Sequence, residues 1–158
     1  MKAERILRPL LSAHILAVIF GLVLTLGAHT SYAQLSYFAL TPCRAVDTRN
    51  PAGVNGGPAL TTTTRNFQIR GNCGVPTTAK AISMNVTITG ATTTTSSWLT
   101  IWPSGGTEPV VSTINFTSAD SAVANGAIVG LSTNTQDLSV QNATGSVHVI
   151  LDVTGYFQ

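Results

Sequence analysis

The chain has 158 residues, of which 44% are hydrophobic and 9% are charged, and its formal net charge is +2. Residues 34–158 contain five basic and five acidic side chains, so their net charge is zero, which argues against the basic surface that nucleic-acid binding requires. Plentiful, patterned apolar residues beside Thr, Ser, Asn and Gly exclude a disordered chain and are typical of an extracellular β protein.

Residues 1–33 are predicted to be a secretory signal peptide. Three basic residues lie near the start, an almost wholly apolar run follows over 10–26, and Ser31-Tyr32-Ala33 offers small residues at positions −3 and −1. This pattern predicts cleavage after Ala33. The apolar run approaches the roughly 20 residues that span a bilayer, so an uncleaved membrane anchor stays open as the alternative.

Alternation of apolar and polar residues dominates the remaining chain and predicts β-strands. The clearest strand is Ala81–Thr89, and the last strand alternates in the same way except that Ile150 gives its second face an apolar residue. No helical pattern of useful length appears after residue 33. Strands are expected, in chain order, over 35–40, 43–49, 66–70, 81–89, 98–102, 110–116, 124–132, 136–141 and 146–157.

Strong turn signals separate these strands, among them "NPAGVNGGP" at 50–58 and "GNCGVP" at 71–76. About nine short strands without crossover helices predict an all-β fold, a single β-sandwich over 34–158 with Greek-key or jelly-roll-like connections. The apolar positions predicted to face the core are Ile82, Met84, Val86, Leu99, Ile101, Ile114, Val129, Leu131 and Val149.

The stretch "PCRAVDTR", residues 42–49, begins with one of the two cysteines of the chain. In an oxidising compartment, Cys43 and Cys73 have one possible intramolecular pairing, so a disulfide is predicted. Closing a loop of about 30 residues would stabilise the fold by roughly 3–4 kcal/mol. A zinc or redox site is disfavoured because there is no CxxC pair and no nearby histidine.

The same stretch carries charged residues that are rare elsewhere in the chain. On a regular strand, Cys43, Asp47 and Arg49 would share one face and Arg44 would lie on the other. We expect Asp47 and Arg49 to form a largely buried, hydrogen-bonded pair. The pair would reach Asp152 if the first and last strands are neighbours.

The stretch "WLTIW", residues 98–102, is the predicted ligand-binding candidate. Alternation directs Leu99 and Ile101 to the core and Trp98, Thr100 and Trp102 to the other face. Two exposed indoles about 13 Å apart would suit stacking on sugar rings or packing on a protein partner. The alternative is that a neighbouring loop covers one or both indoles.

Catalytic and metal chemistry find little support. His148 is the sole histidine after residue 33; it lies within a predicted strand, and the chain has no Gly-x-Ser-x-Gly motif. The five acids of residues 34–158 are scattered, and no stretch packs alternating acids as a calcium loop does. We therefore expect a protein that is not an enzyme, with no catalytic residues, metal ligands or cofactor.

The motifs also resemble a known family. In order, "PCRAVDTR", "CGVP", "AISMNVTIT", "LTIWPSG", "STINF", "VANGAIVGL" and "DVTGYF" are similar to those of the PCRxxDTR…DVTGYF modules of bacterial secreted and cell-surface proteins. The resemblance covers nearly all of 34–158. It implies a module of a kind that is often tandem or appended to hydrolases and other surface domains, with a largely undefined activity of its own. One copy is recognisable here.

Taken together, these patterns predict a secreted, non-catalytic module that acts at the cell surface or in the extracellular matrix. Carbohydrate of the envelope or matrix is the expected ligand, and nucleic acid is not an expected partner. A self-associating surface or fibre subunit is the alternative, because near-zero net charge does not oppose association. A secreted hydrolase is the least favoured alternative.

Overall fold

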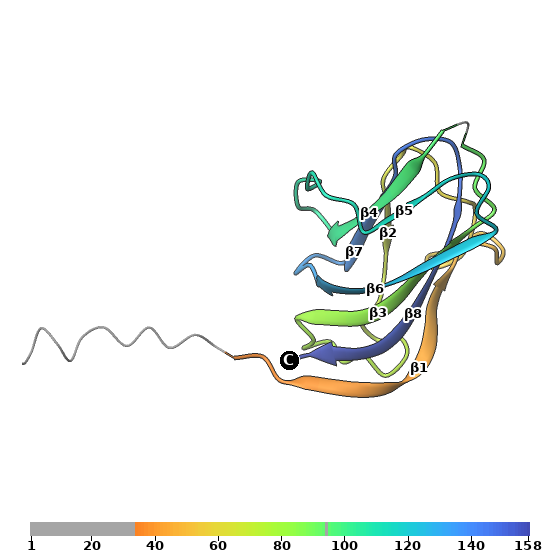
Figure 1. Cartoon of the computed structure of the whole chain (residues 1–158). Coiled ribbons are helices and arrows are strands. Elements are labelled where there is room, and N and C mark those ends of the chain that lie inside the picture. Colours follow the sequence, from red (N-terminus) through yellow and green to blue (C-terminus); the bar gives the residue numbers. More distant parts are fainter. Residues whose placement is uncertain (1–33, 94) are drawn as a thin grey trace, which may run out of the picture. The chain divides into compact units, whose positions relative to one another are not determined.

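A computed structural model describes residues 34–158 except residue 94, and these residues form an all-β fold (Figure 1). Eight strands make two antiparallel four-stranded sheets, in agreement with the predicted sandwich. Residues 35–158 group as one compact unit. The predicted signal peptide lies outside the described residues. Within the described part, no helix is long and apolar enough to cross a membrane.

The first sheet contains the first and the last strand side by side. Its order is β1 (Tyr37–Asp47), β8 (His148–Phe157), β3 (Ala81–Thr89) and β6 (Ala122–Gly130). The second sheet has the order β2 (Arg65–Phe67), β7 (Leu138–Asn142), β4 (Ser97–Pro103) and β5 (Ile114–Phe116). Most connections cross from one sheet to the other, and these two orders are those of an eight-stranded jelly roll.

The described residues contain eight strands rather than about nine because two expected strands are one. The expected strands at 35–40 and 43–49 form a single β1, which stays paired with β8 through two register shifts. One shift lies between Ala39 and Cys43, around Pro42, and the other between Arg44 and Val46. A proline can be accommodated in an edge strand at such an irregularity, because no ladder donor is needed there.

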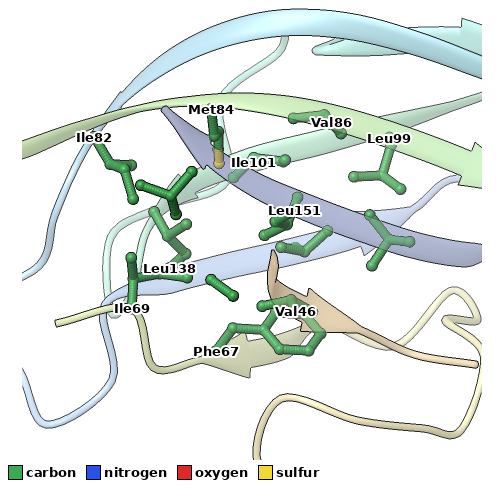
Figure 2. Close-up of a cluster of buried hydrophobic side chains, with 14 of the residues drawn as sticks. Val46, Phe67, Ile69, Ile82, Met84, Val86, Leu99, Ile101, Leu138 and Leu151 are labelled. Carbon is green, nitrogen blue, oxygen red and sulfur yellow. The ribbon is translucent and has the colours of Figure 1, made fainter. Parts of the chain in front are cut away.

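The core lies between the two sheets, where side chains from both inner faces meet (Figure 2). Seven of the nine predicted core residues are buried, among them Ile82, Leu99 and Val149. Val129 and Leu131 are only partly buried, because they belong to β6 and the residue after it, at the edge of the first sheet. The strongest alternation in the sequence thus corresponds to the centre of the fold, and the weaker pattern to its rim.

Candidate functional site

The outer face of β4 carries the predicted binding residues. Leu99 and Ile101 are in the core, so the expected division of this strand between two faces is confirmed. Trp98 exposes 45% of its surface, whereas Thr100 and Trp102 are buried. The prediction of a platform with two exposed indoles is therefore wrong. Of these three side chains, that of Trp98 is the accessible one.

The loop over 104–113, which connects β4 to β5, covers the other two side chains. The indole Nε1–H of Trp102 donates to the backbone oxygen of Gly106 at 3.0 Å. The hydroxyl of Thr100 donates to the backbone oxygen of Val111, also at 3.0 Å. The loop thus folds back along β4 and covers Trp102 but not Trp98. This is the predicted alternative in which a neighbouring loop covers one of the two indoles.

An open groove with a volume of about 470 Å³ lies where this loop meets Trp98. Asn115 on β5 is the cross-strand partner of Trp98, so an amide stands beside the indole. The groove thus combines one flat aromatic ring, an apolar wall and hydrogen-bonding groups. Its principal lining residues are Trp98, Glu108, Pro109, Val110, Val111 and Asn115.

The PCRAVDTR stretch is a structural junction. The Cys43–Cys73 disulfide is present, with the two Cα atoms 5.6 Å apart, and it links β1 in one sheet to the loop that follows β2 in the other. A disulfide agrees with an oxidising, extracellular compartment. The ring of His148 also contacts this stretch, because its Nδ1 lies 3.0 Å from the backbone oxygen of Thr48. That histidine therefore sits in a structural contact.

Asp47 and Arg49 form the predicted pair. The guanidinium donates from Nη2 to Oδ2 of Asp47 at 2.6 Å and from Nε to Oδ1 at 2.9 Å, and the backbone N–H of Arg49 donates to Oδ1 at 3.1 Å. Asp47 is buried, but 47% of the Arg49 side chain is exposed. The expectation of a largely buried pair is therefore wrong for its arginine.

Asp152 is reached by a different arginine from the one expected. Arg44 donates from Nε to Oδ1 of Asp152 at 2.9 Å, and its Nη1 lies 3.4 Å from Oδ2 of Asp47. Strict alternation would separate Arg44 from Asp47, but the register shift between Arg44 and Val46 brings both to one side. The four residues, Asp152, Arg44, Asp47 and Arg49, form one continuous row of alternating charge.

This row predicts a specific dependence of stability on pH. The hydrogen bonds from Arg49 lower the pKa of Asp47 from 3.8 to about 2 in the folded protein. Because the folded pKa lies below the unfolded one, the stabilisation is present above pH 4 and is lost as the pH falls toward 2. We expect the free energy of unfolding of the wild type to fall by about 1–2 kcal/mol more than that of Asp47→Asn between pH 4 and pH 2. Denaturant unfolding of both proteins measures this difference. A constant difference between the two proteins over that range would contradict this assignment.

A buried ion pair was not predicted from the sequence. Asp137, which directly precedes β7, is fully buried and pairs with Arg70, of whose side chain 17% is exposed. One carboxylate oxygen also accepts the backbone N–H groups of Ile69 and Arg70, each at 2.6 Å. The two charged residues are 67 positions apart, and the strand predicted over 136–141 indicates no partner for Asp137. The usable signal was a lone acid near the start of a predicted strand.

Metal ligation has no candidate among the residues that the structure describes. In that part of the chain, no group of three or more His, Cys, Asp or Glu side chains could hold a metal ion. The Trp98 groove and the charged row on β1 and β8 are the two features that the sequence predictions concern. Of these, the groove is open to a ligand, and the row joins neighbouring strands.

Comparison with known proteins adds no assignment to these observations. No family model matches the chain, and neither a curated protein nor a solved structure is significantly similar to it. The resemblance to the PCRxxDTR…DVTGYF modules therefore stays a prediction, and the chemistry of the groove itself is the guide to function.

Proposed function

We propose that the chain is a secreted, non-catalytic β-sandwich module that binds carbohydrate at the cell surface or in the extracellular matrix. The observation that carries this proposal is the half-exposed indole of Trp98 on an open groove. The disulfide and the predicted signal peptide support an extracellular place of action. Jelly rolls also occur in lectin domains, although a fold alone does not determine function.

The groove has the chemistry that a sugar ring requires. An indole offers a flat apolar face for the C–H side of a pyranose ring and is accessible here without any rearrangement. Beside it, the carboxylate of Glu108 can accept hydrogen bonds from hydroxyl groups, and the amide of Asn115 can both donate and accept. The exposed side chains of Val110 and Val111 add apolar surface on the loop side. A neutral polysaccharide fits this mixture.

The contacts of the acidic residues favour binding over catalysis. Asp47, Asp137 and Asp152 pair with arginines, and Asp120 accepts hydrogen bonds from Thr117 within a loop. Glu108 is the acid that lines the groove, and among the described lining residues it stands without a second acid or a histidine. Hydrolysis of a glycosidic bond ordinarily uses two carboxyl groups at a defined separation. A single carboxylate is better suited to orienting a ligand.

Trp98→Ala is expected to weaken binding to envelope or matrix polysaccharide by about tenfold or more, because a central aromatic residue dominates such contacts. The measurement is co-sedimentation of the secreted protein with insoluble cell-wall polysaccharides. Phe38→Ala is the matched control, since Phe38 is 44% exposed but lies on β1 in the other sheet. Because Trp98 is half exposed, the variant should keep the wild-type fold.

Two results would count against sugar binding in this groove. One is that the wild type is not retained by any of the polysaccharides. The other is that Trp98→Ala and Phe38→Ala bind equally well. Intrinsic fluorescence provides a second readout: the chain has two tryptophans, and Trp102 is already buried, so a shift on ligand addition should disappear in Trp98→Phe.

A further inference from the structure

The two sheets of the described residues have four edge strands, and three of these are poorly suited to pair with another chain. β2 and β5 are three residues long, and β2 begins with Arg65. β1 is long, but it contains Pro42 and Arg44 and is interrupted by two register shifts. Short length, charge, proline and irregular register are the devices by which natural sheets prevent edge-to-edge association.

The fourth edge strand, β6, has none of these features. Its nine residues, Ala122–Gly130, each lie opposite a residue of β3, without a register shift. Its sequence, AVANGAIVG, contains no charge and no proline. Six of the nine residues are exposed, including Ile128 at 67%. Such a strand is a ready template for one more strand.

The outer side of β6 has few partners within the described residues. No strand pairs with it there, although β4 and β5 of the second sheet lie close to β6 and the amide of Asn125 donates to the backbone oxygen of Thr113 at 2.9 Å. Figure 1 shows β6 as the strand of the first sheet nearest to β5, with both drawn as separate ribbons. Neither of these neighbouring strands forms ladder hydrogen bonds with β6.

We propose that β6 pairs with β6 of a second copy of this chain. The pairing is antiparallel about a two-fold axis through Gly126, which is the register that pairs all nine residues. In this register Ala124 faces Ile128, Val123 faces Val129 and Asn125 faces Ala127, so most pairs are apolar and no charges are opposed. The two first sheets then continue into one another.

A second copy fits this edge better than other partners. A strand without charge offers nothing to steer a charged peptide, whereas an antiparallel pair of identical strands satisfies every outward N–H and C=O group on both sides. The contact is isologous and closes on itself. A fibre would need a second open edge, and β1, β2 and β5 do not provide one. The inferred assembly is therefore a dimer.

The test compares charge variants of the full chain. Each variant is expressed with the predicted signal peptide and purified in the form that the host secretes. Ala124→Lys/Ile128→Lys places lysine opposite lysine twice across the axis and should lower the dimerisation constant at least about tenfold. Val54→Lys/Thr62→Lys adds the same charge at exposed loop positions and should dimerise as the wild type does. Sedimentation velocity over a wide concentration range measures both.

A charge reversal tests the register. Ala124→Lys/Ile128→Glu places lysine opposite glutamate across the same axis and should restore dimerisation relative to the double-lysine variant. All these positions are exposed, so circular dichroism and melting should match the wild type. A wild type that is monomeric at every concentration would overturn the proposal. So would a double-lysine variant that dimerises normally, or a charge reversal that restores nothing.

A cysteine at the axis provides an independent check. A Cβ at Gly126 would meet no atom within 4 Å, so Gly126→Cys should fold normally. A residue on the two-fold axis faces itself, and the two Cβ atoms of such a pair lie close enough to form a disulfide with modest adjustment. Gly126→Cys should therefore cross-link readily, and Ile128→Cys, which faces Ala124, should not. Equal cross-linking of the two variants would contradict the register.

Discussion

Asp137→Ala is expected to lower the free energy of unfolding by about 3–5 kcal/mol, a large effect for a single substitution. Asp137 is fully buried, and it lies against the guanidinium of Arg70. Removing the carboxylate leaves that largely buried positive charge without its partner. It also leaves the backbone N–H groups of Ile69 and Arg70 without an acceptor, and each unpaired buried donor is costly.

The backbone of Asp137 holds the carboxylate in place between separate segments of the chain. Its backbone N–H donates to the oxygen of Phe67, at the end of β2. Its backbone oxygen accepts from Ser104, just after β4, and from Ser132, in the turn before β7. One residue thus connects three separate segments of the chain. Alanine keeps these backbone bonds, so the expected loss comes from the carboxylate, which pairs with Arg70 and accepts the N–H groups of Ile69 and Arg70.

Asp152→Ala is the matched control for this prediction. Asp152 also pairs with an arginine, but the side chain of Arg44 is about half exposed and that of Asp152 is partly exposed. An exposed ion pair contributes about 0–1 kcal/mol, so this variant should be nearly as stable as the wild type. Denaturant unfolding of both variants gives the comparison. Similar losses in the two would show that burial of Asp137 does not determine its contribution.

The sequence predicts much of the fold because alternation is a local property of a strand. Apolar residues recur at every second position over 81–89, and β3 has the expected bounds, Ala81–Thr89. The prediction fails where other contacts compete with the ladder. The strand expected over 66–70 shortens to β2 (Arg65–Phe67), because the next N–H group, that of Gln68, donates to Asn55, and those of Ile69 and Arg70 donate to Asp137.

The candidate site was less predictable because it depends on contacts between distant segments. Alternation assigns Trp98 and Trp102 to one face, but it carries no information on the loop over 104–113 that buries the second indole. A register shift also has no signature in alternation, so the contact of Arg44 with Asp47 could not be derived. What the sequence does provide is the list of side chains able to form such contacts.

Removal of the disulfide is expected to lower the free energy of unfolding by about 3–4 kcal/mol, a loss close to that of Asp137→Ala. The bond closes a segment with a sequence separation of 30 between Cys43 and Cys73, and opening it returns that conformational freedom to the unfolded chain. Cys43 lies on β1 of the first sheet, and Cys73 lies in the loop that follows β2 of the second sheet. The bond therefore also holds the two sheets together at that end. Denaturant unfolding of Cys43→Ala/Cys73→Ala measures the loss.

The backbone at Cys73 allows a sharper experiment. Cys73 has a φ of 53°, in the left-handed region, where a residue with a Cβ is disfavoured by roughly 1–2 kcal/mol and glycine is not. We therefore expect Cys43→Ala/Cys73→Gly to be more stable than Cys43→Ala/Cys73→Ala, by about 1 kcal/mol, because both lack the bond but only alanine retains the strain. Equal stabilities of the two variants would mean that this turn adopts another conformation once the bond is gone. The left-handed φ of residue 73 would then depend on the disulfide itself.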